Sequence, residues 1–212
     1  MAKSYYNIIE TLVSIYAVDG DTLKILLKQK KNEPYQNYWL LPGDVLSTED
    51  TLEECASKVV LRATNLPSIY LEEGLTFSNL DRDPEERIIA ATFMALTVKE
   101  FVRNTVLEWF DIDELPKMAY DHGQIARDNI KKIKSKIIRN ENDILFSIFP
   151  NDFTLSELQH FFEKILGKEL DRRNFRKKLI SENIVVETGG MARTNGRPSK
   201  LYKFNRGGHF HE

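Results

Sequence analysis

The stretch YWLLPGDVLSTEDTLEECASKVVLRATNL (Tyr38–Leu66) joins a short apolar run to a turn and then to a helical pattern. After the turn, apolar residues recur at spacings of three and four, at Leu52, Cys55, Ala56, Val59, Val60 and Ala63. This spacing predicts an amphipathic helix with one apolar face.

Strand-like runs lie on both sides of this helix. They are rich in β-branched and aromatic residues and occupy Thr11–Val18, Leu23–Lys30, Leu71–Ser78, Arg87–Leu96 and Val106–Ile112. The turn Asp19–Gly20–Asp21 predicts that the first two runs form a hairpin. A polar helix with an apolar isoleucine stripe is expected from Asp121 to about Asn140. The first part of the chain therefore reads as mixed α/β.

The composition restricts the class of protein. The 212 residues are 42% apolar and 29% charged, which is typical of a globular chain that builds its own core. Cys55 is the only cysteine, so no disulfide forms within the chain and a cytoplasmic location is expected. The first residues lack the pattern of a signal peptide, and no uncharged apolar run is long enough for a bilayer, so no membrane partner is expected.

The charge is distributed unevenly along the chain. Residues 1 to 150 carry 18 Lys and Arg against 24 Asp and Glu, whereas residues 151 to 206 carry 12 against 7. An acidic larger part is thus joined to a smaller basic part. This asymmetry predicts that the C-terminal part contacts a polyanion.

The basic part has the pattern of a winged helix-turn-helix. Thr154 and Glu157 form a capping-box pattern ahead of a helix that ends at Gly167. Asp171 begins a second helix, whose inner face is expected to contain Phe175, Leu179 and Ile180. Two short strands, IVVET and KLYKFN, follow with a glycine-rich loop between them.

The second helix and the loop supply the candidate DNA-binding residues, because cations neutralise phosphates and a helix fits the major groove. These candidates are Arg172, Arg173, Asn174, Arg176, Lys177, Lys178, Arg193, Arg197 and Lys200. The alternative is that a basic helix is only a solvated surface. The coincidence of the cations with a helix-turn-helix pattern favours DNA. An RNA-binding module is disfavoured, since the nearby aromatic residues fall on inward stripes.

The stretch Tyr38–Leu66 resembles the Nudix hydrolase region, whose box reads G-x5-E-x7-R-E-U-x-E-E-x-G-U with U aliphatic, and LEWFDIDELPKMAYDH resembles the segment that follows it. Aligned on LPG, Asp44 and Asp50 take the places of the box glycine and the first glutamate. The central arginine and glutamate of the box fall on Lys58 and Val59, and its glutamate pair falls on Arg62 and Ala63. A register that starts at Gly43 and Glu49 places Leu61 and Arg62 at the glutamate pair, so neither register restores the site. Mg2+ requires oxygen ligands, so no catalytic residue and no metal are assigned, and Arg62 is a candidate for neutralising part of the ligand's charge.

The whole chain resembles Nudix-related transcriptional regulators of NAD synthesis or sugar use, on DRDPEERIIAATFMAL (Asp81–Leu96) and GRPSKLYKFN (Gly196–Asn205). The resemblance implies an α+β fold, an α/β/α sandwich with a mixed sheet followed by a winged helix-turn-helix. It also implies that the degenerate pocket senses a phosphorylated metabolite such as ADP-ribose. The effector-binding candidates, carried over by position, are Lys30, Trp39, Phe77, Arg82 and Arg87. Core packing is the alternative for Trp39, and pairing with nearby acids such as Asp81, Asp83, Glu85 or Glu86 is the alternative for the two arginines.

These observations lead to one prediction and one alternative. We predict a homodimeric repressor that binds a double-stranded DNA operator, senses a phosphorylated metabolite and needs no cofactor. Its expected parts are a sensing and dimerisation domain (1–142), a DNA-binding domain (143–206) and a tail (207–212). The alternative is a divergent Nudix pyrophosphatase that recruits other carboxylates, for which Glu53, Glu54, Asp81, Asp83, Glu85 and Glu86 are available. The tail histidines His209 and His211 and the lone His122 are not assigned as metal ligands.

Overall fold

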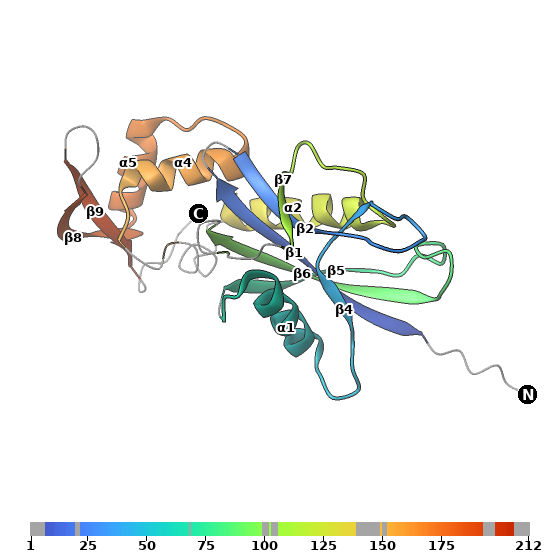
Figure 1. The fold of residues 1–212 in the computed structure, drawn as a ribbon. Coiled ribbons are helices and arrows are strands. Elements are labelled where there is room, and N and C mark those ends of the chain that lie inside the picture. Colours follow the sequence, from blue (N-terminus) through green and yellow to red (C-terminus); the bar gives the residue numbers. More distant parts are fainter. Residues whose placement is uncertain are drawn as a thin grey trace, which may run out of the picture. The chain divides into compact units, whose positions relative to one another are not determined.

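The first part of the chain is built on one mixed sheet (Figure 1). The structure, a computed structural model, describes residues 7–19, 22–67, 69–98, 102, 106–138, 149, 152–192 and 198–205. The sheet runs in the order β3-β2-β1-β6-β5, with β4 paired to β1 and β7 paired to β2. Its strands are β1 (Ile8–Asp19), β2 (Thr22–Gln29), β3 (Trp39–Leu40), β4 (Gly43–Val45), β5 (Tyr70–Phe77), β6 (Ile88–Val98) and β7 (Glu108–Asp111).

The two central strands, β1 and β6, are parallel, and the other pairings are antiparallel. Every residue of β1 from Thr11 to Ala17 is buried. A strand covered on both faces requires a nearly continuous apolar run, and the sequence LVSIYA (Leu12–Ala17) meets this requirement. The strand therefore lies at the centre of the core, where neither of its faces contacts water.

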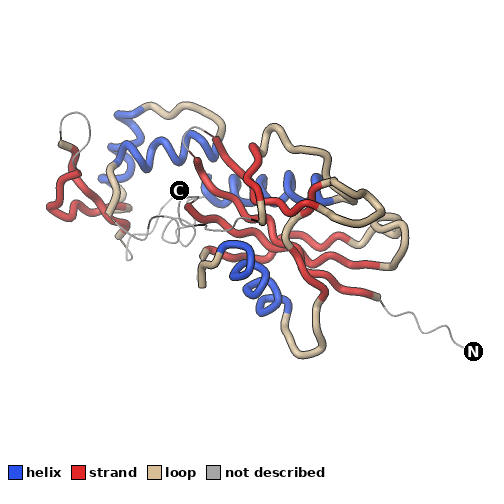
Figure 2. The backbone as a smooth tube through the Cα atoms, viewed as in Figure 1, coloured by secondary structure: helices blue, strands red, loops and turns tan. Residues whose placement is uncertain are grey.

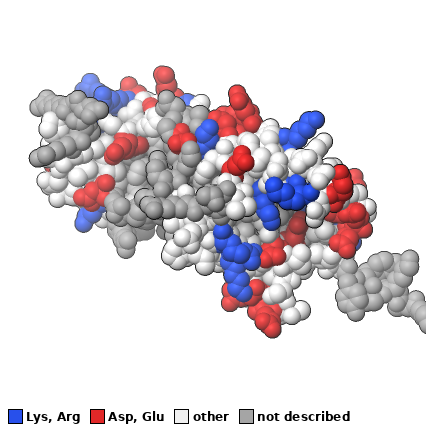
Figure 3. Space-filling model, in the orientation of Figure 1, with Lys and Arg blue, Asp and Glu red and all other residues white. Residues whose placement is uncertain are grey.

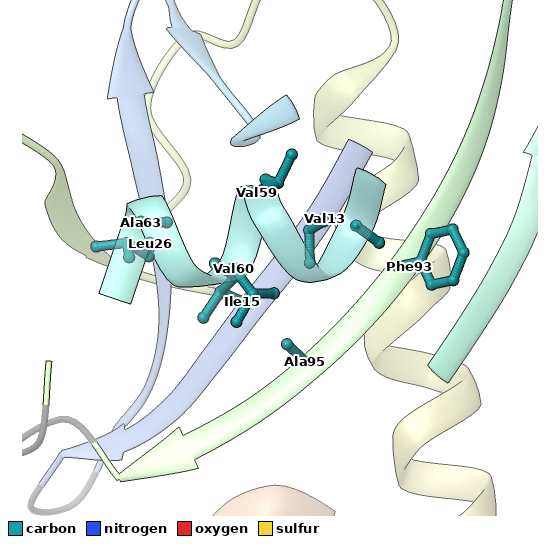
Figure 4. Close-up of a cluster of buried hydrophobic side chains, with 9 residues drawn as sticks. Val13, Ile15, Leu26, Val59, Val60, Ala63, Phe93 and Ala95 are labelled. Atoms are coloured by element: carbon teal, nitrogen blue, oxygen red, sulfur yellow. The ribbon is translucent and has the colours of Figure 1, made fainter. Parts of the chain in front are cut away.

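Helices cover the two faces of the sheet, as Figure 2 shows. Side chains alternate between the faces of a strand, so Val13 and Ile15 of β1 pack against α1 (Leu52–Thr64), as seen in Figure 4. The intervening residues face α2 (His122–Ile138). The Tyr16 hydroxyl donates to the Ala126 carbonyl (2.5 Å), and Asn129 Nδ2 donates to Ser14 Oγ (3.0 Å). The expected α/β/α sandwich with a mixed sheet is confirmed.

The short strands β3 and β4 were not anticipated from the sequence. Each contains only two or three residues, too few for a period-two pattern to be visible. They matter for the site because Pro42, between them, accepts a hydrogen bond from the Val13 amide (2.8 Å). This contact fixes the LPG segment against the central strand.

The chain divides into two compact units, residues 1–133 and 134–212. The expected boundary between residues 142 and 143 and the expected tail lie outside the described residues. The second unit consists of α4 (Leu155–Leu166), α5 (Arg172–Ser181), β8 (Val185–Ala192) and β9 (Ser199–Phe204). Strands β8 and β9 form an antiparallel hairpin, here called the wing.

Local signals set the ends of the helices in this unit. Thr154 and Glu157 form the expected capping box, and Gly167 ends α4 in the left-handed conformation (φ 65°). The core of the unit includes Leu158, Phe161 and Leu179. Ile180 was expected on the inner face of α5, and this is wrong, because its side chain is 54% exposed. It lies one position, or about 100°, beyond Leu179 on the helix and so points away from the core.

Within the described ranges, no helix has the length and apolar character that crossing a membrane requires.

Candidate functional site

One end of the sheet brings together the residues expected to bind an effector. The N-terminal ends of β1 and β6 lie side by side, since Ile8 pairs with Ile88. The antiparallel pairings bring the C-terminal ends of β2 and β5 to the same end of the sheet. Four of the candidates lie at these strand ends: Lys30 follows β2, Trp39 of β3 pairs with Gln29 of β2, Phe77 ends β5 and Arg87 precedes β6. The topology therefore gathers residues that are far apart in the sequence.

Arg82 lies at the same end of the sheet but is buried, with only 3% of its side chain exposed. Its guanidinium donates to both carboxylate oxygens of Asp121 (3.0 and 2.8 Å) and to Glu10 (2.8 Å). Burial alone would lower the pKa of Arg82, but the two carboxylates produce a net rise. Burial raises the pKa of Glu10, although Arg82 opposes the rise. Arg82 therefore holds the start of β1 to the residue that precedes α2.

The partners of the two arginines differ from the alternatives considered from the sequence. Arg82 pairs with Glu10 and Asp121, which are distant in the sequence. Arg87 donates to the backbone carbonyls of Ser78 and Asn79 (2.9 and 3.1 Å). It therefore closes the loop that contains Arg82.

His122 ties this network to the LPG segment. Burial lowers its pKa to about 3, and the positive charge of Arg82 adds to the effect. The imidazole is therefore neutral at pH 7, and its Nδ1 accepts a hydrogen bond from the Leu41 amide (3.1 Å). The position of the LPG segment therefore depends on a neutral His122.

A cluster of tyrosines beside Lys30 and Trp39 was missed by the sequence reasoning. The ring centroids of Tyr35 and Tyr120 are 5.0 Å apart, and those of Tyr35 and Tyr38 are 5.7 Å apart. The Lys30 ammonium lies 5.8 Å from the centre of the Tyr120 ring. Tyr35 and Tyr120 both have positive φ angles (66° and 54°), which bulky residues rarely adopt. Such strained residues gather at functional sites, and the only available signal was the aromatic density of PYQNYW (Pro34–Trp39).

The degenerate box lies on α1 and the loop before it, and the structure distinguishes its two registers. Asn65 ends α1 in the left-handed conformation (φ 59°), which is the conformation that a glycine at the end of the box would favour. Only the register that begins at Asp44 places the second glycine of the box, near its C-terminal end, on Asn65. In this register Val59 and Ala63 stand at two glutamate positions, and they are 3% and 4% exposed and packed on the sheet.

The remaining box positions form ion pairs with one another. Lys58 contacts Asp50 and Arg62 contacts Asp44, each at 2.6 Å. Figure 3 shows acidic and basic atoms side by side in the area of α1. Two cations thus neutralise the two acids. One of the cations, Arg62, stands where a Nudix enzyme would present a carboxylate to Mg2+, and Asp50, at the first glutamate position, is occupied by Lys58. No group of three or more His, Cys, Asp or Glu side chains with the arrangement of a metal site occurs among the described residues.

In the second unit, α5 exposes most of the residues expected to bind DNA. Arg172, Arg173, Asn174, Lys177 and Lys178 are exposed, and Arg176 is half-buried. Arg176 Nη2 donates to Ser156 Oγ (2.9 Å), and Lys200 on the wing pairs with Glu187 (2.9 Å). The remaining two candidates, Arg193 and Arg197, lie outside the described residues. Phe175 packs against Phe162 with ring centroids 5.4 Å apart, so it belongs to the core and not to the surface.

Comparison with known proteins identifies the family. Residues 145–204 match the family described as NrtR DNA-binding winged helix domain. The ADPR responsive transcriptional repressor NtrR of Acinetobacter baylyi is 31% identical over 201 residues, which cover 91% of this chain and 80% of that protein. The chain belongs to the NrtR family of transcriptional regulators. The expected resemblance to Nudix-related regulators is therefore confirmed.

The NrtR assignment extends to the fold of both units. The chain superimposes on the crystal structure of Shewanella oneidensis NrtR complexed with a 27mer DNA with a TM-score of 0.80 and 23% identity. The match covers 93% of this chain and 93% of that chain. An ADP-ribose pyrophosphatase of Methanocaldococcus jannaschii is 28% identical over 134 residues, which cover 61% of this chain and 79% of the enzyme. The alignment with this enzyme spans about as many residues as the first unit contains.

Proposed function

We propose that this chain is a cytoplasmic, homodimeric transcriptional repressor whose affinity for operator DNA depends on ADP-ribose. The relative from Acinetobacter baylyi is named as ADPR responsive, and that from Methanocaldococcus jannaschii is named as acting on ADP-ribose. Both names support an ADP-ribose site in the first unit. A dimer would present two α5 helices to successive major grooves, as palindromic operators require.

The observation that carries the proposal is the state of the box on α1. Lys58 and Arg62 neutralise Asp50 and Asp44, and Val59 and Ala63 are buried in the core. A metal-assisted diphosphate hydrolase needs several carboxylates around Mg2+ to neutralise the leaving group. Without a surplus of carboxylates, the unit is suited to binding a diphosphate and not to cleaving it.

The proposed ligand site is the aromatic and cationic end of the sheet. Trp39 packs edge-on against Phe110 with ring centroids 4.5 Å apart, and two members of the tyrosine cluster, Tyr35 and Tyr38, precede it in the sequence. Aromatic rings suit an adenine base, and the Lys30 ammonium suits a phosphate. Phe77 and Arg87 are proposed to contribute from β5 and the start of β6. Because Arg82 is occupied by Glu10 and Asp121, we assign it the role of positioning the loop.

Incubation with ADP-ribose and Mg2+ separates this proposal from a pyrophosphatase. We expect no AMP or ribose 5-phosphate above the protein-free control, measured by chromatography over hours. The Methanocaldococcus jannaschii enzyme serves as the positive control under the same conditions. AMP that accumulates in proportion to the concentration of this chain would support the pyrophosphatase and contradict the proposal.

A further inference from the structure

A polar hollow of about 230 Å3 lies within the second unit, between the start of α4, the first turns of α5 and the wing. Three cationic side chains reach it, Arg172 and Arg176 from α5 and Lys200 from β9. Arg172 and Arg176 are four residues apart and therefore lie on one stripe of the helix. Thr154, Ser156 and Tyr202 add hydroxyl groups to the lining.

The charges around the hollow are incompletely compensated. Lys200 has a partner in Glu187. In contrast, Arg176 Nε is shielded from solvent and has no hydrogen-bond partner among the described residues. Burial lowers the pKa of Arg176, and the positive charge of the neighbouring Arg172 lowers it further. A buried donor without a partner and two adjacent like charges are both unfavourable, and an anion bound in the hollow would offset the repulsion between Arg172 and Arg176.

We propose that this hollow is a seat for one phosphate of the DNA backbone, with Arg176 as its fixed anchor. The inference rests on the proposed DNA-binding function and divides the basic residues into two groups. Arg172, Arg176 and Lys200 position the duplex through a phosphate. The neighbouring stripe of α5, with Arg173 and Lys177, is exposed, does not line the hollow and is available for base edges.

The geometry favours a phosphate over a base at this place. Arginine matches phosphate oxygens with two parallel donors. Ser156 Oγ holds Arg176 Nη2 at 2.9 Å, so the guanidinium is already oriented. The first turn of α4 adds amide groups for which the helix has no internal acceptor, and it lies at the positive end of the helix dipole. A phosphate seat of this kind fixes the register of α5 without reading sequence.

The test is a double-mutant cycle between the protein and the duplex. The duplex is an operator selected by the protein itself from a random pool, and a neutral methylphosphonate replaces one phosphate at a time along it. We expect one position in each half-site at which the replacement weakens the binding of the unaltered protein about tenfold. With Arg176→Gln, the same replacement should cost less than about twofold, because the charged contact is already lost.

Two control variants test whether the effect is specific to the guanidinium of Arg176. Lys178→Gln removes a cation of the same helix outside the hollow, and it should weaken binding without cancelling the effect at that position. Arg176→Lys keeps the charge without the planar fork, and it should retain part of the effect; circular dichroism verifies that each variant is folded. Arg176→Gln should also lower the salt slope of log K by about one and leave the sequence preference unchanged.

The outcomes separate this inference from the proposed function. In one outcome the duplex is bound, and the loss of binding free energy from Arg176→Gln adds to the loss from the methylphosphonate at every position. In that case the phosphate seat is contradicted and the proposed DNA binding stands. A change in the preferred sequence with Arg176→Gln would assign Arg176 to base readout and overturn the inference as well. If the folded chain selects no duplex at all, both fail.

Discussion

Replacing Arg82 with methionine should lower the free energy of unfolding of the first unit by about 3–5 kcal/mol. The guanidinium is 3% exposed and contacts Glu10 and Asp121. Methionine fills much of the same space but leaves two partly buried carboxylates, 20% and 21% exposed, without a positive partner. Removing one member of a buried ionic cluster costs more than the cluster contributes, since the remaining charges have already lost much of their hydration.

Urea unfolding followed by tryptophan fluorescence measures this effect in the correct unit, because both tryptophans, Trp39 and Trp109, belong to residues 1–133. The matched control is Arg87→Met. Arg87 donates only to backbone carbonyls at the exposed end of the same loop, so we expect a loss of about 1 kcal/mol.

A second variant distinguishes lost charge balance from lost packing. Combining Arg82→Met with Glu10→Gln and Asp121→Asn removes all three charges, and it should recover at least half of the lost stability. If Arg82→Met alone costs less than about 1 kcal/mol, Arg82 does not stabilise the fold by joining β1 to the start of α2.

The double substitution Arg173→Ala with Lys177→Ala should weaken operator binding by about 100-fold at fixed salt. Both side chains are exposed and lie one turn apart on the same stripe of α5. Each charged hydrogen bond to DNA contributes roughly 1.5–3 kcal/mol, so the loss of two contacts is large even if they are partly redundant. The fold should be preserved, since exposed substitutions rarely change stability by more than about 0.5 kcal/mol.

Fluorescence anisotropy with the selected operator measures this loss, and a control variant must remove the same charge elsewhere. Lys31→Ala with Lys131→Ala removes two exposed cations of the first unit, and it should change the affinity less than about threefold, because these cations lie outside the unit that is proposed to bind DNA. Equal losses in the two double variants would mean that net charge, and not the surface of α5, determines binding.

Local signals allowed much of the fold to be predicted from the sequence. The capping box of Thr154 and Glu157 is contained within four residues, and the buried run of β1 is continuous. Asp171 also caps α5 as expected, since its side chain accepts a hydrogen bond from the Asn174 amide (2.7 Å). The mismatch with the Nudix box could also be recognised from the sequence, because it depends only on which residues stand at fixed spacings.

The arrangement of the site was harder to predict, because its contacts join distant parts of the chain. Glu10 lies 72 residues before Arg82 and Asp121 lies 39 residues after it, while nearer acids in the DRDPEER segment offered more obvious partners. The tyrosine cluster depends on positive φ angles at Tyr35 and Tyr120, which no propensity rule would assign. The ion pairs of Lys58 and Arg62 could be located only after α1 and the loop before it had been placed in space.

The most direct test of the central claim is a titration of the full-length chain with its selected operator, at constant salt, in the presence and absence of ADP-ribose. AMP and ribose 5-phosphate serve as controls, because each contains only half of the ligand. We expect saturating ADP-ribose to shift the operator Kd at least about fivefold, the lower end of typical allosteric coupling, and to be recovered intact afterwards. An operator Kd that is the same with and without ADP-ribose, or ADP-ribose recovered as its cleavage products, would contradict the account.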